Sequence, residues 1–333
     1  KLIDDFDCIS TLAELTKVAA SAFCPLITAV DSELVNIDNW GDLKPHLELH
    51  QTLAEPSHHR WQQIRAMSES QFLALVSPRV LVRSRYQQGP YHERNLFFHE
   101  EIHSHEDQLW GNSAYRYASA IIQSFVQTGW FLHIRQPYDA ISCYHADPGL
   151  IDGSFNIDKP QTECYITDQT EKQLNKIGLI VAKQHKVSHH LGFYAQHSAH
   201  LPIHYQRQHI NYNAYLSAQL PYLLCASRFA QTLKVILRDK VGRYSSAEEC
   251  EIDMQKWLLS FCAAADGTTG ETLARYPLSE ANVKIESLPQ QPGHYHCITH
   301  IKPHCLLAAI DSQLTLVSQI HLRSPQQDAA HVS

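Results

Sequence analysis

Apolar residues recur at the spacing of an amphipathic helix over residues 11–23. Leu12, Leu15 and Val18 lie three residues apart and therefore share one side of a helix. Pro25 ends this pattern, because proline lacks the backbone N–H that a helix interior requires. The apolar and β-branched residues at 26–30 predict a short strand, so the first predicted unit is a helix followed by a strand.

The same alternation continues beyond this unit. Further helices are predicted over 56–67, 110–127 and 169–177, and further strands over 79–83, 130–134, 163–166 and 179–182. Two stretches rich in turn-forming residues, 87–107 and 136–160, are predicted to be loops. Alternating helices and strands are typical of layered α/β proteins.

The second half of the chain has a different pattern. Residues 210–241 form one long apolar helical pattern, which Pro221 divides, so that a second helix is expected from about Tyr222 onward. A further amphipathic helix is predicted to begin at the capping-box pair Ser246 and Glu249. This part of the chain therefore contributes a pair of helices.

Alternating apolar and polar residues predict strands at the end of the chain. Residues 281–285 and 295–301 form a predicted hairpin, and 313–320 a last strand. We predict an α/β fold (mixed α+β), built of helix and strand layers with a C-terminal helix pair and antiparallel strands. The predicted division is 1–212 and 213–333.

Composition narrows the class of protein. The 333 residues are 44% hydrophobic and 18% charged, which is the balance of a folded globular chain. The formal net charge of −7 gives no electrostatic reason to bind nucleic acid or anionic lipid. No apolar run approaches the roughly 18 residues of a membrane span. Nine cysteines without a C-x-x-C pair predict reduced thiols and a cytoplasmic protein.

Two residue types depart from average usage. Glycine occurs 12 times, about half the usual share, and the phosphate-binding patterns G-x-G-x-x-G and G-x-x-x-x-G-K-[ST] are absent. A nucleophile elbow, G-x-S-x-G, is absent as well. Histidine is abundant, with 23 residues, which raises the question of a metal site.

One local motif supports a zinc site. His99-Glu-Glu-Ile-His103 matches H-E-x-x-H, which on a helix would bind zinc through two imidazoles with Glu100 as general base. A third protein ligand is required, yet residues 108–138 contain no Asp or Glu, and the motif lies in a predicted loop. We predict no catalytic or metal-binding residue here, and a zinc hydrolase remains an alternative function.

A second group of histidines lies near the end of the chain. His294, His296 and His300 would share one face of a strand, where they could capture a metal ion. The same spacing also arises when imidazoles face solvent while Cys297 and Ile301 face the core. We favour the second interpretation.

Several motifs resemble one family along nearly the whole chain. They are Leu109-Trp-Gly-Asn-Ser-Ala-Tyr115, Glu163 with Ile166-Thr-Asp168, Asn213-Ala-Tyr-Leu-Ser-Ala-Gln-Leu-Pro-Tyr222, Ser227-Arg-Phe-Ala230 and Arg238-Asp-Lys-Val-Gly242. In this order they resemble the TssC/VipB family, the large subunit of the contractile sheath of type VI secretion systems.

The resemblance implies a mechanical function and no cofactor. Subunits of this kind assemble with a small TssB/VipA-type subunit and with further copies of themselves around an Hcp-type inner tube, which the contracting sheath propels. A ClpV-type ATPase later takes the sheath apart. Since family members have a longer N-terminal part and this chain begins with Lys1, we expect a truncated piece that lacks the ATPase contact. A phage- or bacteriocin-type tail sheath shares these mechanics and is a further alternative.

The last predicted strand is the candidate interface. It comprises Gln313, Leu314, Thr315, Leu316, Val317, Ser318, Gln319 and Ile320. An exposed terminal strand can join the sheet of a neighbouring subunit through main-chain hydrogen bonds. An ordinary edge or internal strand explains the same weak alternation, so both interpretations stay open.

Overall fold

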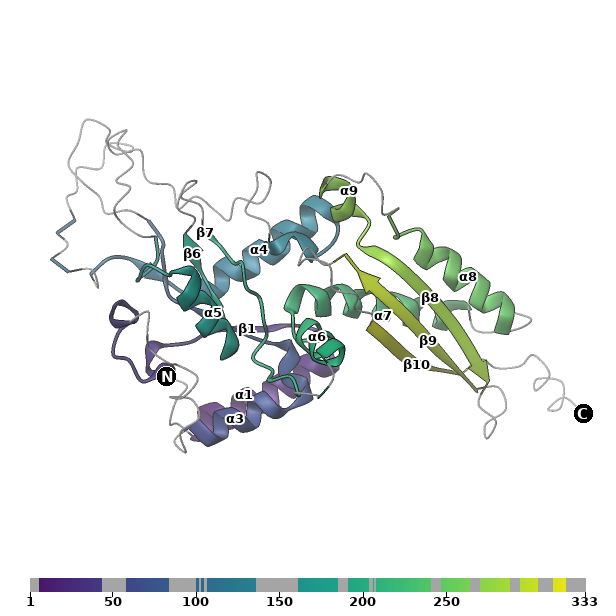
Figure 1. Ribbon diagram of the computed structural model, residues 1–333, viewed down its shortest axis with the longest axis horizontal. Helices are drawn as coiled ribbons and strands as arrows, with labels where there is room; N and C mark the ends of the chain where they lie inside the picture. Colours follow the sequence, from purple (N-terminus) through teal and green to yellow (C-terminus); the bar gives the residue numbers. More distant parts are fainter. Residues whose placement is uncertain are drawn as a thin grey trace, which may run out of the picture. The chain divides into compact units, whose positions relative to one another are not determined.

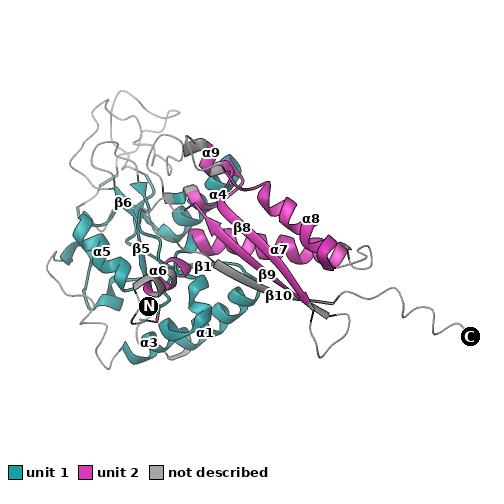
Figure 2. Cartoon of the chain, turned by 45° about the vertical axis from the view of Figure 1, so that its right-hand side comes forward, with its two compact units in different colours: residues 1–127, 133–202, 218–220 teal, residues 128–132, 203–217, 221–333 magenta. Residues whose placement is uncertain are grey.

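The computed structural model describes residues 6–43, 58–83, 100–101, 103–104, 107–135, 161–184, 191–203, 206, 208–240, 247–263, 270–287, 294–304 and 314–321. The chain divides into two compact units (Figure 2). Unit 1 comprises Lys1–Gln127, His133–Pro202 and Ala218–Leu220, and unit 2 comprises Thr128–Leu132, Ile203–Ser217 and Pro221–Ser333. The sequence-based division at 212/213 stays a prediction.

Unit 1 contains a parallel sheet of three strands. The order is β1 (Leu26–Ala29), β2 (Leu73–Ser77) and β5 (Leu179–Val181), with β2 in the centre. Each strand comes after a helix in the chain, and the alternating pattern predicted this for β1 and β5 but not for the central strand β2. All five residues of β2 are buried, because a central parallel strand is covered on both faces.

Three helices accompany this sheet: α1 (Phe6–Ser21), α3 (His59–Ala66) and α5 (Asp168–Lys176) (Figure 1). The core of unit 1 joins apolar residues of these helices to β2 and β5, namely Ile9, Leu12, Trp61, Ile64, Leu73, Leu75, Leu174, Ile177, Leu179 and Val181. Helix α5 begins at an N-cap, where the Thr170 N–H donates to the side chain of Thr167 at 3.1 Å. It ends before Gly178, whose φ of 86° suits glycine.

A fourth helix of unit 1, α4 (Ser113–Thr128), has a buried side that includes Tyr117. The Tyr117 ring packs edge-on against Phe193, with 4.9 Å between centroids, and its hydroxyl donates to Gln196 Oε1 at 3.2 Å. The described part of unit 1 also contains short elements: η1 (Ser32–Val35), η2 (Trp40–Asp42), η4 (Ser68–Phe72), and the strand pairs β3 (Val80–Leu81) with β4 (Trp110–Gly111) and β6 (Lys183–Gln184) with β7 (Leu191–Gly192).

Two predicted strands are wrong. Over 130–134 the chain forms a 3₁₀ turn, η6 (Leu132–Arg135), and Trp130 is buried by stacking on Phe229 rather than by pairing in a sheet. No residue of 163–166 lies in a strand: the preceding Thr162 forms an isolated bridge with Val80, and the chain then enters the N-cap of α5. In both places apolar side chains, such as Trp130 in one and Cys164 and Ile166 in the other, pack into a core without joining a sheet.

Unit 2 combines helices with an antiparallel sheet. The helices are α6 (Gln208–Ser217), α7 (Leu220–Lys240), α8 (Ala247–Leu259) and α9 (Gly270–Arg275), and the sheet has the order β10 (Leu314–His321), β9 (His294–Pro303), β8 (Leu278–Ser287). Pro221 lies in the first turn of α7, where its missing N–H is tolerated, and the break predicted from it lies just before that helix. The predicted helix pair and antiparallel strands, and with them the mixed α/β class, are confirmed.

The core of unit 2 lies between α7, α8 and the sheet. Apolar side chains of both helices and of strands β8 and β9 meet there: Cys225, Phe229, Leu233, Leu237, Cys250, Met254, Leu258, Leu278, Val283, Ile285, Cys297 and Ile301. An aromatic group extends this core, since Trp130 stacks on Phe229 at 4.7 Å and meets Phe261 edge-on at 5.4 Å.

Candidate assembly surface

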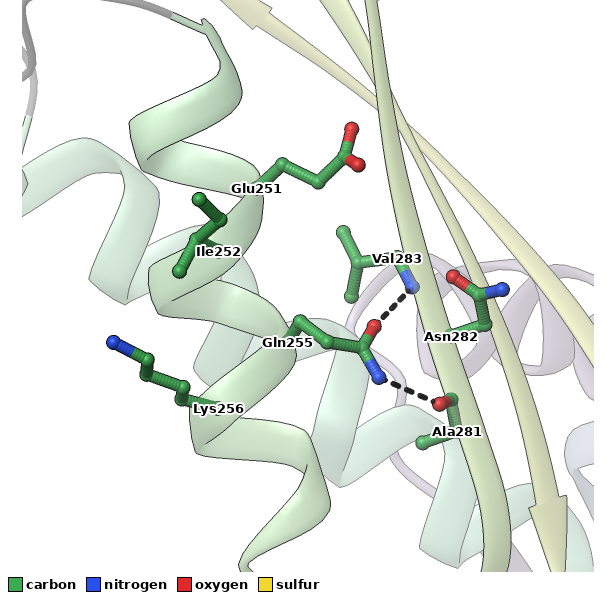
Figure 3. A pocket seen from close by; sticks show the side chains of 7 residues that line it. All are labelled: Glu251, Ile252, Gln255, Lys256, Ala281, Asn282 and Val283. Carbon is green, nitrogen blue, oxygen red and sulfur yellow. Dashed lines mark hydrogen bonds between the residues drawn. The ribbon is translucent and has the colours of Figure 1, made fainter.

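The two edges of the β10-β9-β8 sheet differ in how they are covered, and this difference defines the candidate site. Side chains of α8 bind the outer edge of β8 (Figure 3). Gln255 Nε2 donates to the Ala281 carbonyl at 2.9 Å, and the Val283 N–H donates to Gln255 Oε1 at 2.8 Å. One helical turn earlier, Glu251 Oε2 accepts a hydrogen bond from the Ile285 N–H at 2.9 Å.

The start of β8 is paired by backbone instead. The Leu278 N–H donates to the Phe261 carbonyl at 3.1 Å, and the Leu278 carbonyl accepts from the Ala263 N–H at 3.0 Å. Phe261 and Ala263 come directly after α8 in the chain. Helix α8 and the residues after it thus bind the β8 edge at four positions, Leu278, Ala281, Val283 and Ile285.

The arrangement of Gln255 resembles a pairing strand. A side-chain amide offers one donor and one acceptor, as a peptide group does, and here they serve the carbonyl of Ala281 and the N–H of Val283 two residues further on. An open hollow of about 400 Å³ lies beside this contact, lined by Glu251, Ile252, Gln255, Lys256, Ala281, Asn282 and Val283.

The opposite edge belongs to β10. This strand pairs with β9 over its whole length, from Leu314 opposite Ile301 to His321 opposite His294. In the part of the chain that the structure describes, no further strand pairs with β10. An edge of this kind presents backbone N–H and C=O groups to which another strand can bind.

The hydrogen bonds of β8 also determine which backbone groups of β10 point away from β9. Val283 directs its N–H away from β9, and successive residues of a strand alternate, so Asn282 faces β9 and pairs with His300. The neighbouring Thr299 then faces β10, where its partner is Leu316. The backbone groups of Thr315, Val317 and Gln319 accordingly point outward from the sheet.

The predicted interface residues can now be placed. Leu314–Ile320 lie in β10, at the edge of the sheet, and Gln313 lies outside the described residues. Within the chain β10 is an ordinary edge strand, which was one of the two interpretations. That the same strand also binds a neighbouring subunit stays a prediction.

Polar residues cover the exposed face of β8. Lys284 and Glu286 form an ion pair at 2.5 Å, and Lys302 of β9 lies 3.5 Å from Glu280. The hydrogen bond from Lys284 lowers the pKa of Glu286. On β9, Cys297 and Ile301 are buried, while His296 and His300 are half-buried on the other face, and the side chain of His294 lies outside the described part of the structure.

The H-E-x-x-H segment does not form a zinc-binding helix in its described part. His99 lies outside the described residues, and Glu100, Glu101 and His103 are not helical. The Glu100 carboxylate accepts two hydrogen bonds from the Arg83 guanidinium, at 2.7 and 3.1 Å. Among the described residues no group of three or more His, Cys, Asp or Glu side chains could hold a metal ion.

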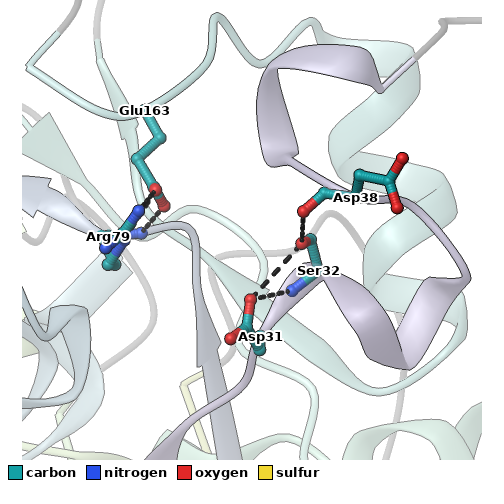
Figure 4. Close-up of polar contacts among 5 residues, drawn as sticks. All are labelled: Asp31, Ser32, Asp38, Arg79 and Glu163. Atoms are coloured by element: carbon teal, nitrogen blue, oxygen red, sulfur yellow. Dashed lines mark hydrogen bonds and ion pairs between the residues drawn. The ribbon is translucent and has the colours of Figure 1, made fainter. Parts of the chain in front are cut away.

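The carboxyl end of the parallel sheet is where enzymes of the α/β class commonly bind ligands. Here the polar side chains bind one another or the backbone (Figure 4). Asp31 after β1 accepts from the Ser32 N–H at 2.7 Å and begins η1, and Arg79 after β2 pairs with Glu163. Lys183 after β5 donates to Glu171 at 2.8 Å. These contacts secure loops and helix ends.

Sequence patterns did not reveal Gln255 and Glu251. A Glu and a Gln four residues apart share a face of α8, but the same spacing is common on solvated helices. Their role depends on where α8 lies against β8, which only the tertiary structure shows.

Comparisons with known proteins agree with a tail sheath protein. Residues 2–200 match the family described as VipB (EvpB/VC_A0108), tail sheath N-terminal domain, and residues 185–320 match VipB_2, its tail sheath gpW/gp25-like domain. The chain therefore belongs to the VipB family of tail sheath proteins, and the resemblance found in the sequence is confirmed.

Among individual proteins, the chain is similar to the type VI secretion system sheath protein TssC1 of Pseudomonas aeruginosa (strain PAO1). The two are 30% identical over 324 residues, which cover 94% of this chain and 64% of that protein. The chain thus spans a little under two thirds of this relative's length.

A chain of the anti-feeding prophage baseplate, solved by cryo-EM, aligns with 95% of this chain and 63% of its own length, at a TM-score of 0.43 and 9% identity. That likeness is too weak to establish a shared fold. Among the described helices, none combines the length and apolar character needed to cross a membrane.

Proposed function

We propose that this chain is a structural subunit of the contractile sheath of a type VI secretion system, of the large TssC/VipB type. The observation that carries the proposal is membership of the VipB family over two consecutive tail sheath domains, residues 2–200 and 185–320. The similarity to TssC1 over 94% of the chain supports it.

In this proposal the subunit assembles with a small TssB/VipA-type subunit and with further copies of itself around an Hcp-type inner tube. Residues 313–320 form the interface and add to the sheet of a neighbour. The one-sided covering of the unit 2 sheet supports this choice of strand, because β8 is bound by α8 whereas β10 is the other edge.

A helical sheath requires contacts between different surfaces of identical subunits. Such contacts repeat from subunit to subunit without forming a closed ring. Strand addition provides such a contact, since a strand of one subunit enters the sheet of the next. Contraction then requires two packings of the same subunits and no chemical step. The subunit acts in the cytoplasm, and a ClpV-type ATPase takes the contracted sheath apart.

The test is assembly of the full-length protein with its small partner. Co-expression of the two is expected to give hollow tubules by negative-stain electron microscopy, whereas each protein alone does not. Monodisperse protein that carries stoichiometric zinc by elemental analysis would overturn the proposal in favour of a hydrolase. Tubules that form without a small partner would point to a phage- or bacteriocin-type tail sheath instead.

A further inference from the structure

The two α8 side chains on the β8 edge have a consequence for assembly. A sheet with two open edges can add strands on both sides, and uncontrolled addition leads to aggregation. At the β8 edge the N–H groups of Val283 and Ile285 already donate to Gln255 and Glu251. A strand that approached this edge would have to displace both side chains.

We propose that Gln255 and Glu251 confine intermolecular strand addition to the β10 edge by occupying the β8 edge. The strand they exclude is an extended segment of a second copy of this chain. The proposal rests on the proposed function only in taking β10 as the assembling edge.

Their geometry suits this role. Gln255 satisfies a donor and an acceptor two residues apart on β8, so the hydrogen bonds that attract an incoming strand are already made. Glu251 brings a carboxylate to the Ile285 N–H, and burying that charge under another strand would cost free energy. Both side chains project from a well-packed helix, since Cys250, Met254 and Leu258 on α8 are buried in the core.

The hydrogen bonds themselves can be tested by hydrogen–deuterium exchange on the full chain. In the double variant Gln255→Ala/Glu251→Ala, the amides of Val283 and Ile285 should exchange roughly five- to tenfold faster, the effect of losing one hydrogen bond each. The matched control is Lys256→Ala, which lies beside the same hollow and should leave both amides unchanged. Unchanged exchange in the double variant would overturn the proposal.

Sedimentation velocity of the chain alone tests the consequence. The Ala double variant should self-associate as its concentration rises. Wild type and Lys256→Ala should show the same distribution of sedimentation coefficients as each other. A second double variant, Gln255→Lys/Glu251→Lys, removes the same two acceptors but leaves charges at the edge, which oppose strand addition, and should not associate.

The outcomes separate an open edge from a loss of folding. Association of both double variants would mean that they have unfolded and would overturn the proposal, as would an Ala variant that exchanges faster without associating. Neither result depends on tubule formation by wild type with the small partner. The proposed function can therefore fail while this inference holds, and this inference can fail while the proposed function holds.

Discussion

The guanidinium of Arg228 lies over the indole ring of Trp130, with its carbon 4.4 Å from the ring centroid. The same guanidinium donates a hydrogen bond to the Gly129 carbonyl. Trp130 in turn stacks on Phe229 of α7, so Arg228 fastens the 128–132 segment onto the aromatic core of unit 2. This contact agrees with a structural role for an arginine that the sequence places in a motif of the sheath family.

Arg228→Ala should lower the free energy of unfolding by about 1–2 kcal/mol, because it removes a cation–π contact and a charge-assisted hydrogen bond. Arg228→Lys should lose less, since an ammonium keeps the charge but not the planar fork. Arg238→Ala is the control: its exposed ion pair with the adjacent Asp239 should contribute at most about 0.5 kcal/mol. Urea denaturation measures all three, and equal losses for Arg228→Ala and Arg238→Ala would refute this assignment.

Two glycines with positive φ form a matched pair that differs in the space available for an added side chain. At Gly178, with φ of 86°, an added Cβ would lie 2.9 Å from the Ala199 Cα, whereas at Gly129, with φ of 76°, it would meet nothing within 4 Å. Gly129→Ala should therefore cost only the left-handed backbone strain, about 1–2 kcal/mol. Gly178→Ala should cost about 1–3 kcal/mol more, because backbone must move. Equal changes in the free energy of unfolding would show that the Ala199 contact relaxes freely.

His197 makes the stability of unit 1 depend on pH. Its side chain is 4% exposed, and its Nδ1–H donates to the Ser198 carbonyl at 2.8 Å. Burial lowers the pKa of this imidazole from 6.5 to about 4, and the nearby charges of Arg65 and His200 act in the same direction. The unfolded chain therefore binds a proton more readily than the folded chain. The stability contribution is complete above the unfolded pKa and falls as the pH drops through the interval down to the folded pKa.

The variant His197→Asn isolates this effect, because asparagine can still donate to the Ser198 carbonyl but does not titrate. Between pH 6.5 and about 4, wild type should lose up to about 3 kcal/mol more than the variant, the linkage equivalent of the pKa difference. Urea denaturation at a series of pH values measures both curves. Parallel curves over this interval would mean that His197 already binds a proton in the folded state.

Local patterns predicted much of the fold, and their failures have a physical cause. Helices α4, α5, α7 and α8 and strands β8, β9 and β10 were predicted close to their observed positions, because a helical or strand pattern lies within each segment. Helix α1 begins earlier than predicted, at Phe6, and of the three residues that defined its apolar side Leu12 is buried whereas Leu15 and Val18 are exposed. Strand β2 was missed. Its Leu73–Ser77 run follows a helix without a turn signal, and as a central parallel strand it lacks the alternation that marks a half-buried one.

The site was predictable only in part. The terminal strand could be found from its sequence. That β10 rather than β8 is the candidate edge for assembly follows only from the contacts of α8 with β8, at the other edge of the same sheet. That depends on Gln255 meeting Ala281 and Val283, which are more than 25 residues further along the chain. No local pattern encodes such a contact, whereas the family motifs indicated the class of protein directly.

The outward backbone groups of β10 allow a test with two adjacent proline substitutions. Proline lacks the N–H and is tolerated in an edge strand where that N–H points away from the sheet. The N–H of Val317 points outward, whereas Ser318, opposite Cys297, faces β9 and belongs to the ladder. Ser318→Pro therefore removes a hydrogen bond of the β9–β10 ladder, whereas Val317→Pro removes only a donor that faces outward from the sheet.

We expect Val317→Pro to keep the chain folded, with a change in the free energy of unfolding below about 1 kcal/mol, because it leaves the β9–β10 ladder intact. The same variant should form no tubules when co-expressed with the small partner, since an incoming strand would lose an N–H partner and meet the proline ring. Ser318→Pro should instead lower the free energy of unfolding by about 1–3 kcal/mol, because a carbonyl of β9 loses its donor. Urea denaturation and negative-stain microscopy distinguish these results. Normal tubules from Val317→Pro would contradict β10 as the strand-adding edge, because a strand added there would lose one ladder hydrogen bond and meet the proline ring.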